Sequence, residues 1–160
     1  MSKQQNHLND KVTPIQSDSY QSIVDRVIKV YETLNADSLE QLDMLYSQDV
    51  YFEDPAHAIQ GLCALRAYFK KLITNVDHCQ FRFHNTLYDN DRVFLNWTMT
   101  LKHPRLRGDE KIFVEGTSLL KVRGGSVYYH RDYFDLGSML YEHLPVLGYL
   151  IKQIKKGLVS

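Results

Sequence analysis

Two stretches of this sequence place carboxylates in aromatic surroundings, where they could move protons. Asp54 ends the apolar run that begins at Tyr51 and includes Phe52. Partial desolvation at such a place suits a carboxylate to act as a general base. The alternative is a plain turn at a strand end, because Asp and Pro are both common turn residues and Pro55 follows. The sequence leaves both interpretations open.

The second candidate is a histidine and a carboxylate on one strand. His130 and Asp132 lie two residues apart in an alternating segment, so both side chains point to the same side. Tyr129, Arg131 and Tyr133 point to the other side. If His130 and Asp132 face the interior, they can share a pocket wall and transfer a proton. If they face solvent, they form an exposed polar row with a weak ion pair.

Metal and thiol chemistry have little support. None of the seven histidines and two cysteines forms a His-x-x-x-His or Cys-x-x-Cys pair. His130 and Asp132 could supply two ligands, but no third ligand is identifiable. We therefore expect no metal and no cofactor. Cys63 and Cys79 are too few for a disulfide framework, which favours reduced thiols in a cytoplasmic protein.

The elements that must position these residues change character halfway along the chain. Apolar residues recur at helical spacing over 18–34, 38–45 and 61–74. Ser38 and Gln41 have the spacing of a capping box and predict the start of the second helix. A short strand is expected over 50–53.

From residue 79 onward the pattern alternates with period two, which is typical of half-buried strands. Four strands are expected, over 79–88, 92–102, 111–122 and 126–135. A turn at Asn90 and a hairpin at Gly124-Gly125 would join neighbouring strands. This order predicts an α+β fold, a curved antiparallel sheet wrapped around the N-terminal helices with a pocket between them.

The composition sets the broad class. A chain of 160 residues has the length of a single domain. We expect a mobile N-terminal lead over 1–17, the main domain over 18–144 and a terminal helix over 145–160. Nineteen basic and nineteen acidic residues give no net charge, which argues against a nucleic-acid partner. No apolar run is long enough to predict a membrane span. The terminal helix is amphipathic and cationic, so it either rests on a membrane surface or covers a core or a partner subunit.

The outward side of the predicted sheet is unusually apolar for a solvated face. This predicts a homodimer formed through the outer sheet face. The outward residues that carry this prediction are Phe94, Thr98, Thr100, Phe113, Tyr129 and Tyr133.

Three stretches resemble a known family: 34–39 between the first helices, 51–55 followed by Gly61, and 130–135 in the last strand. Together with the element order, they resemble the SnoaL-like branch of the nuclear transport factor 2-like superfamily. The resemblance implies a cone of curved sheet closed by helices, a cystatin-like α+β barrel that is commonly dimeric. Members include ketosteroid isomerases, limonene-epoxide hydrolase and polyketide cyclases, and many others only bind ligands or partners.

The resemblance also assigns positions. It places the general base of ketosteroid isomerase at Asp54, and the two oxyanion donors of that enzyme at Val30 and on or near Ser118. The acid of limonene-epoxide hydrolase would fall on Asp132, and two further polar residues of that enzyme on Trp97 and Met99.

These observations lead to one expected site and two possible functions. Asp54, Asp132 and His130 are the expected catalytic groups. The residues expected to contact a hydrophobic small molecule are Phe52, Trp97, Met99, Ser118 and Tyr128. One function is a lyase or isomerase that moves a proton α to the carbonyl of a hydrophobic substrate. The other is a non-enzymatic ligand-binding or dimerisation module, because an apolar pocket can bind without catalysing.

Overall fold

The fold is known from a computed structural model that describes residues 17–104, 106, 110–141 and 144–158. Of the N-terminal lead predicted over 1–17, residues 1–16 lie outside the described residues, and Ser17 begins the first helix. The elements, in chain order, are α1 (Ser17–Thr33), the 3₁₀ helix η1 (Leu39–Met44), β1 (Tyr46–Glu53), β2 (Ala58–Gln60), α2 (Leu62–Thr74), β3 (His78–Asp89), β4 (Arg92–Lys102), β5 (Ile112–Arg123), β6 (Ser126–Phe134), α3 (Leu136–Met139) and α4 (Pro145–Gly157).

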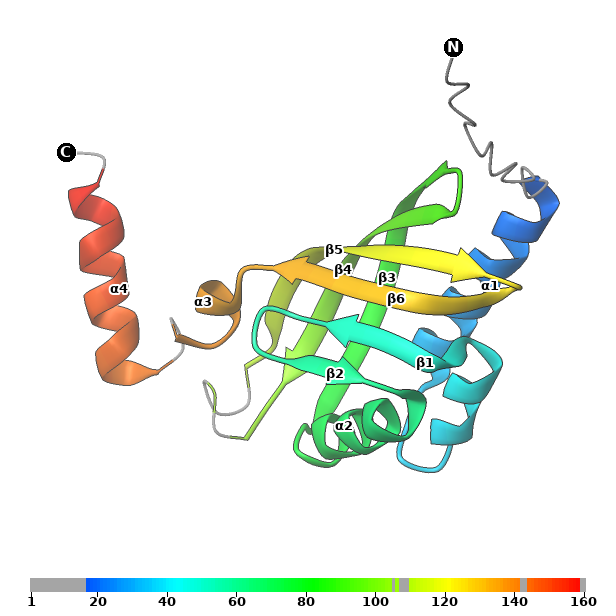
Figure 1. Ribbon diagram of the computed structural model, residues 1–160. Helices are drawn as coiled ribbons and strands as arrows, with labels where there is room; N and C mark the ends of the chain where they lie inside the picture. Colours follow the sequence, from blue (N-terminus) through cyan, green and yellow to red (C-terminus); the bar gives the residue numbers. More distant parts are fainter. Residues whose placement is uncertain (1–16, 105, 107–109, 142–143, 159–160) are drawn as a thin grey trace, which may run out of the picture.

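The described strands form one six-stranded curved sheet in the order β2-β1-β6-β5-β4-β3 (Figure 1). The predicted antiparallel meander of β3, β4, β5 and β6 is confirmed. β1 adds beside β6 in a parallel pairing that the sequence pattern did not predict. Because a long crossover through α2 and the four strands β2 to β5 separates β1 from β6, the chain can return in the same direction.

The predicted turns occur where residues with positive φ are available. Gly124 and Gly125 have φ of 58° and 79° between β5 and β6, and Asn90 has φ of 54° between β3 and β4. These are the left-handed conformations that a tight two-residue hairpin needs. The turns set the register of the meander, and with it the side of the sheet to which each side chain points.

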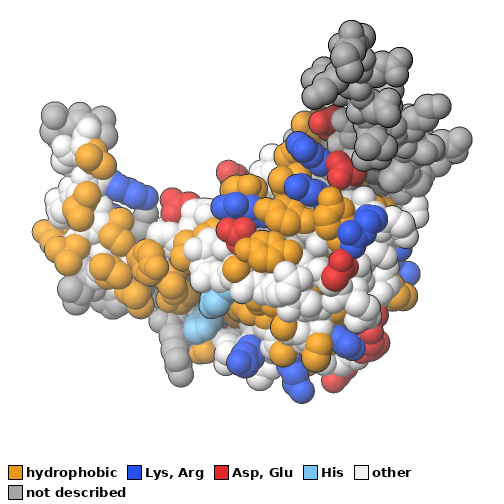
Figure 2. All heavy atoms as spheres, in the orientation of Figure 1, with side chains coloured by type: hydrophobic (Ala, Val, Ile, Leu, Met, Phe, Trp, Pro, Cys, Tyr) orange, Lys and Arg blue, Asp and Glu red, His pale blue; other side chains and the backbone are white. Residues whose placement is uncertain are grey.

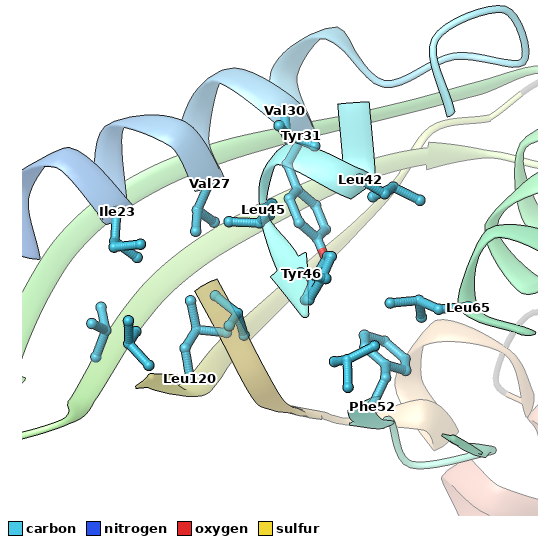
Figure 3. Close-up of a cluster of buried hydrophobic side chains, with 14 of the residues drawn as sticks. Ile23, Val27, Val30, Tyr31, Leu42, Leu45, Tyr46, Phe52, Leu65 and Leu120 are labelled. Atoms are coloured by element: carbon cyan, nitrogen blue, oxygen red, sulfur yellow. The ribbon is translucent and has the colours of Figure 1, made fainter. Parts of the chain in front are cut away.

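The helices lie on the concave side of the sheet, where the main core forms. α1 packs against β3 and α2 against β1. In Figure 3, Ile23 and Val27 of α1 point toward Leu120 of β5, and Leu65 of α2 lies near Phe52 of β1. All five side chains are buried. The curved sheet and its helices form the α+β cone that the sequence pattern indicated.

The second predicted helix is only a 3₁₀ helix, and its capping box does not form. The Ser38 side chain makes no cap bond to η1. Instead, its Oγ accepts a hydrogen bond from the Asn35 N–H at 2.9 Å and donates to the Thr33 carbonyl at 3.2 Å. Gln41 Oε1 accepts from the Thr33 hydroxyl at 3.0 Å. Both side chains therefore stabilise the end of α1 rather than the start of η1.

The C-terminal part extends away from the cone. After β6 the chain forms the short α3 and then α4, which projects from one side of the molecule in Figure 1. The terminal helix predicted over 145–160 is thus observed over Pro145–Gly157. Within the described residues, no helix is long and apolar enough to cross a membrane.

Candidate functional site

The strand register brings the polar candidates to one patch of the concave face. Ser118 of β5 lies directly opposite Asp132 of β6, and Leu120 lies opposite His130. Trp97 of β4 lies opposite Gly116 of β5. Because alternate residues of a strand share a side, Ser118, His130 and Asp132 all face the interior. The inward orientation of His130 and Asp132 follows from the same register that buries Leu120.

Gly116 gives Trp97 the room to reach this patch. A Cβ at position 116 would lie 2.3 Å from the Trp97 ring, closer than two atoms can approach without a shift. With hydrogen in its place, the indole lies against the β5 backbone, and its Nε1 reaches Ser118 Oγ at 2.8 Å. Because Gly116 has no side chain, the Trp97 ring can lie close enough for its N–H to donate to Ser118.

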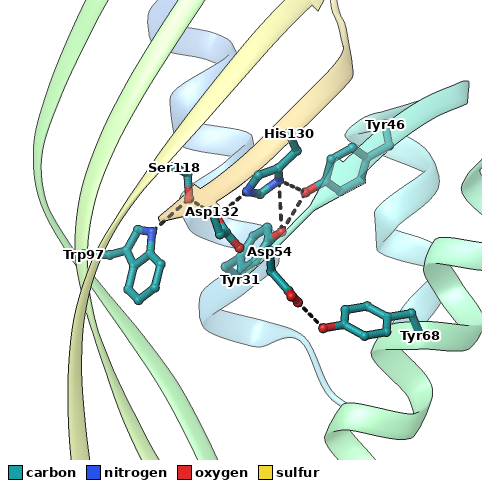
Figure 4. Close-up of polar contacts among 8 residues, drawn as sticks. All are labelled: Tyr31, Tyr46, Asp54, Tyr68, Trp97, Ser118, His130 and Asp132. Carbon is teal, nitrogen blue, oxygen red and sulfur yellow. Dashed lines mark hydrogen bonds and ion pairs between the residues drawn. The ribbon is translucent and has the colours of Figure 1, made fainter. Parts of the chain in front are cut away.

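Six side chains form a continuous chain of hydrogen bonds across the interior (Figure 4). Trp97 binds Ser118, and Ser118 Oγ lies 2.5 Å from Asp132 Oδ1. The same Asp132 oxygen lies 2.7 Å from His130 Nε2. On the other side of the imidazole, His130 Nδ1 lies 2.6 Å from the Tyr46 hydroxyl, which lies 2.6 Å from the Tyr31 hydroxyl. Tyr31 also approaches His130 Nδ1 at 3.4 Å.

The chemistry of its members orients this chain. An indole N–H only donates, so Ser118 accepts from Trp97 and uses its own proton to donate to Asp132. A carboxylate only accepts, so it takes a second hydrogen bond from the His130 Nε2–H. His130 Nδ1 is then the acceptor for the Tyr46 hydroxyl, which accepts from Tyr31. Every member of the chain has a partner, as buried polar groups require.

Burial keeps the two tyrosines protonated. It raises the pKa of Tyr31 well above its ordinary value of 10.0, and the nearby Tyr46 and Asp132 raise it further. Burial also raises the pKa of Tyr46, against a smaller lowering by its hydrogen bond with Tyr31. Both hydroxyls are therefore neutral donors at any physiological pH, the property required of a group that stabilises a developing oxyanion.

The polar chain borders a small internal cavity. Its volume is about 10 Å³, which is about the space that one water molecule needs. The cavity is lined by Val27, Tyr31, Phe81, Phe83, Trp97, Ser118, His130 and Asp132. It is far too small for a hydrophobic ligand, so the expected open pocket is closed by side chains in this conformation.

Asp54 belongs to a separate cluster at the end of β1. Its Oδ1 accepts hydrogen bonds from the backbone N–H of Ala56 at 2.7 Å and of His57 at 2.8 Å. Its Oδ2 accepts from the Tyr68 hydroxyl of α2. The side chain is only 9% exposed. Oδ1 thus holds the turn and Oδ2 binds α2, which corresponds to the turn interpretation. The β1–β6 register, which pairs Phe52 with His130, brings Asp54 to the level of Asp132, but no hydrogen bond among the described residues joins Asp54 to His130 or Asp132.

Two of the residues expected to contact a ligand, Phe52 and Met99, do not line the cavity. The Phe52 ring is buried and packs edge-on against His130 with centroids 4.9 Å apart. Met99 is buried in a neighbouring apolar cluster with Leu101 and Val114. Both residues therefore belong to the apolar packing around the cavity.

The expectation that Tyr128 lines the pocket is wrong. Its hydroxyl donates to Asp91 at 3.3 Å, and the Arg123 guanidinium lies over its ring at 4.8 Å. The cause is a bulge, because Val122 pairs with Val127 whereas Lys121 pairs with Tyr129. The extra residue interrupts the alternation, and Val127 points inward instead.

Sequence reasoning missed the tyrosines. Tyr31 lies on the apolar stripe of α1, where it was expected to be core, one residue after the donor position that the resemblance assigned to Val30. Tyr46 precedes the strand expected over 50–53, because β1 begins earlier than its apolar pattern indicates. Tyr68 lies on the half-buried side of α2. The sequence did carry one signal for these residues. A tyrosine on a buried stripe indicates a polar partner inside the fold, because a buried hydroxyl needs a hydrogen bond.

The arrangement can hold and move a proton, and it offers no metal centre. Among the described residues, no three His, Cys, Asp or Glu side chains come together to hold a metal ion. Asp132 receives two hydrogen bonds on Oδ1, while its Oδ2 has no hydrogen-bond partner within the described parts of the chain. An oriented carboxylate beside a histidine and neutral phenols is an arrangement suited to proton transfer next to a carbonyl.

The chain is similar to one protein family and to several solved structures. A family model described as a SnoaL-like domain matches residues 27–130. A comparison with curated proteins finds no match. Among solved structures, a Catenulispora acidiphila protein with a ketosteroid isomerase-like fold, in complex with trimethylamine, is 18% identical with a TM-score of 0.65, over 74% of this chain and 88% of that one.

Two further structures are similar in fold. An LEH-like epoxide hydrolase of M. tuberculosis is 18% identical with a TM-score of 0.64, over 85% of this chain and 97% of that one. A Jannaschia protein assigned to the SnoaL-like polyketide cyclases is 15% identical with a TM-score of 0.66, over 78% of this chain and 96% of that one. At these identities the likeness establishes the fold.

Proposed function

The chain belongs to the SnoaL-like family, and from that membership we propose that it is a proton-transfer enzyme acting on a small hydrophobic carbonyl compound. The observation that carries the proposal is the buried chain of hydrogen bonds from Trp97 to Tyr31, with the His130–Asp132 pair at its centre. Structural relatives with polyketide cyclase and epoxide hydrolase names support a small-molecule substrate.

In this proposal Asp132 is the base. Its Oδ2 removes a proton from the carbon next to the carbonyl, so the C–H bond breaks, an O–H bond forms and the electron pair moves to the carbonyl oxygen. Tyr31, which burial keeps protonated, turns its hydroxyl proton from Tyr46 to that oxygen and donates a hydrogen bond to it. His130 and Ser118 hold the other Asp132 oxygen in place. Return of the proton to another carbon completes an isomerisation, and loss of a leaving group completes an elimination.

Substrate access requires the cavity to widen. Phe81 and Phe83 line it from β3, which is an edge strand of the sheet, and both are only half-buried. Because β3 is the edge strand of the sheet that the described residues form, rotation of these two rings opens space without breaking the β4–β5–β6 register. Asp54 stays in its turn during the reaction and is not the base.

The test is deuterium exchange, which model ketones can report even though the natural substrate is unidentified. The protein is incubated in D₂O with a panel of cyclic and aromatic ketones, and loss of the α-proton signals is followed by NMR. We expect accelerated exchange for at least one ketone, and a loss of about 10²-fold or more in Asp132→Asn. The amide oxygen of the substituted side chain can still accept from His130 and Ser118, so the melting temperature should change little.

A second function is favoured by one observation, the cavity of about 10 Å³. A cavity too small for a ligand fits a non-enzymatic module that dimerises or binds a partner through its surface, in which Asp132 is purely structural. That module predicts no accelerated exchange with any ketone, in the wild type as in Asp132→Asn. The exchange measurement therefore separates the alternatives.

We further propose that the protein is a homodimer located in the cytoplasm. Phe113 and Tyr133 are 67% and 47% exposed on the outer sheet face, which supports burial of that face by a second copy. Arg131 and Lys121 lie over Tyr133 and Tyr129, so part of this face is already covered within the chain. Both cysteines are unpaired, which fits a reducing compartment.

A further inference from the structure

The α4 helix presents an apolar face that the described part of the protein leaves uncovered. Leu147, Leu150 and Ile154 lie at helical spacing on one side of α4 and are 39%, 51% and 64% exposed. Leu158, next after the helix, is 80% exposed. Figure 2 shows this apolar surface along the projecting helix, separated from the cone by a hollow. Of the roles left open for this stripe, a membrane surface, a core or a partner subunit, the described residues do not show it covering a core.

The helix faces the rest of the chain with a different edge. Gly148 is buried and Ile151 is half-buried. Lys155, one turn further on, places its Nζ 3.9 Å from Asp135 Oδ2 at the start of α3. These three positions follow one another at helical spacing. The orientation of α4 is thus set by this edge, which turns the leucine face outward.

Charge distinguishes the two sides of the helix. Lys152, Lys155 and Lys156 all lie off the apolar face, and the helix contains no aspartate or glutamate. Tyr149, 64% exposed, lies among the lysines on the polar side. An aliphatic face backed by lysines, with a tyrosine among them, is the composition of helices that lie in a lipid–water interface.

We propose that α4 binds the surface of an anionic lipid bilayer. Its axis lies parallel to the membrane, with Leu147, Leu150 and Ile154 inserted between the headgroups and the lysines on the opposite, polar side, close enough to be attracted by the anionic lipids. Binding is peripheral and does not involve a span. The proposal is independent of the proton-transfer function.

A second copy of the chain fits this face less well. Thirteen residues at about 1.5 Å each give a helix about 20 Å long and about 10 Å wide. Its footprint is therefore about 200 Å², whereas a stable protein interface buries about 800 Å² on each partner. A bilayer needs no matching shape, and its negative headgroups complement the excess of lysine.

The test is co-sedimentation of the full chain with vesicles of phosphatidylcholine alone or mixed with phosphatidylglycerol. We expect binding to the mixed vesicles that weakens as salt is added. The double variant Leu150→Ser and Ile154→Ser should bind at least about tenfold more weakly, because it removes the inserted aliphatic groups. Lys152→Gln should weaken binding to the mixed vesicles about fivefold.

Gln153→Ser, on the polar side of the same helix, is the matched control and should bind like the wild type. Circular dichroism and the melting temperature should be unchanged in all variants. Failure of the wild type to sediment with mixed vesicles overturns the proposal, as does equal binding to neutral and mixed vesicles. Dissociation of a wild-type oligomer by the double variant, seen by light scattering, would assign the face to protein contact instead.

Discussion

Ser118 determines the direction of the buried hydrogen-bond chain, because it stands between Trp97, which only donates, and Asp132, which as a carboxylate only accepts. Without this hydroxyl, the Trp97 N–H and the Asp132 carboxylate would be separated by the gap that the serine oxygen fills. The hydroxyl therefore couples the packing of β4 to the orientation of the proposed base. At this scale the site is defined by which atoms can donate and which can accept.

Ser118→Ala should lower the free energy of unfolding by about 1–3 kcal/mol, because it leaves the Trp97 N–H buried without an acceptor. Urea denaturation monitored by tryptophan fluorescence measures this directly, since Trp97 is the one tryptophan in the sequence. Ser47→Ala is the control, because the partly exposed Ser47 hydroxyl makes a long 3.4 Å hydrogen bond to the Val127 carbonyl and one to the exposed Asp49 carboxylate, so its loss leaves no buried donor unpaired. Equal stability of the two variants would contradict the proposed role.

The buried tyrosines predict a dependence of stability on alkaline pH. Burial raises the pKa of Tyr31 and Tyr46 above 10.0, so these groups stay protonated in the folded state while the unfolded chain loses protons near pH 10. Their contribution is complete below about pH 10 and is lost as the pH rises above it. The melting temperature should fall progressively as the pH rises above about pH 10.

Tyr46→Phe should make that fall shallower, because one of the responsible groups is absent. The matched variant Tyr149→Phe removes an exposed hydroxyl of α4 and should leave the slope unchanged. Melting curves followed by circular dichroism across the pH range provide the measurement. Identical slopes in the wild type and Tyr46→Phe would show that the Tyr46 hydroxyl is not held as described.

At the scale of elements, the contact between β4 and β5 depends on a missing side chain. Gly116→Ala would place a methyl group 2.3 Å from the Trp97 ring. Because the ring is buried and cannot move freely, we expect a loss of about 1–3 kcal/mol in the free energy of unfolding. The control is Gly157→Ala near the end of α4, where an added Cβ meets no atom within 4 Å. A Gly116→Ala protein as stable as the wild type would mean that Trp97 has another place to go.

At the scale of the whole molecule, the outer sheet face is the candidate dimer surface. Light scattering at micromolar concentration should give about twice the monomer mass of 18.7 kDa. Phe113→Glu should shift the mass toward that of the monomer, because a charge would be buried in an apolar interface. Met44→Glu, at an exposed position on η1, is the control and should leave the mass unchanged. A wild-type protein with a clean monomer mass would refute the dimer.

Local pattern was sufficient for much of this protein. The period of the apolar residues predicted the helices and the four-stranded meander, and the alternation on β6 predicted that His130 and Asp132 share a side. Gly124 and Asn90 marked the turns that set the register. Together with the stretches at 34–39, 51–55 and 130–135, these features were enough to indicate the family. All of them depend only on neighbours within a few residues of one another.

Only the tertiary structure decided the contacts between residues that are distant in the chain. Tyr31 and Tyr46 meet His130 only because α1 packs against β3 on the concave side of the sheet and β1 pairs with β6, about a hundred residues later in the case of Tyr31. The bulge that turns Tyr128 outward arises from pairing with β5, and the alternation of β6 alone does not show it. The size of the cavity is likewise a sum over packed side chains from several elements, so no single segment of the sequence specifies it.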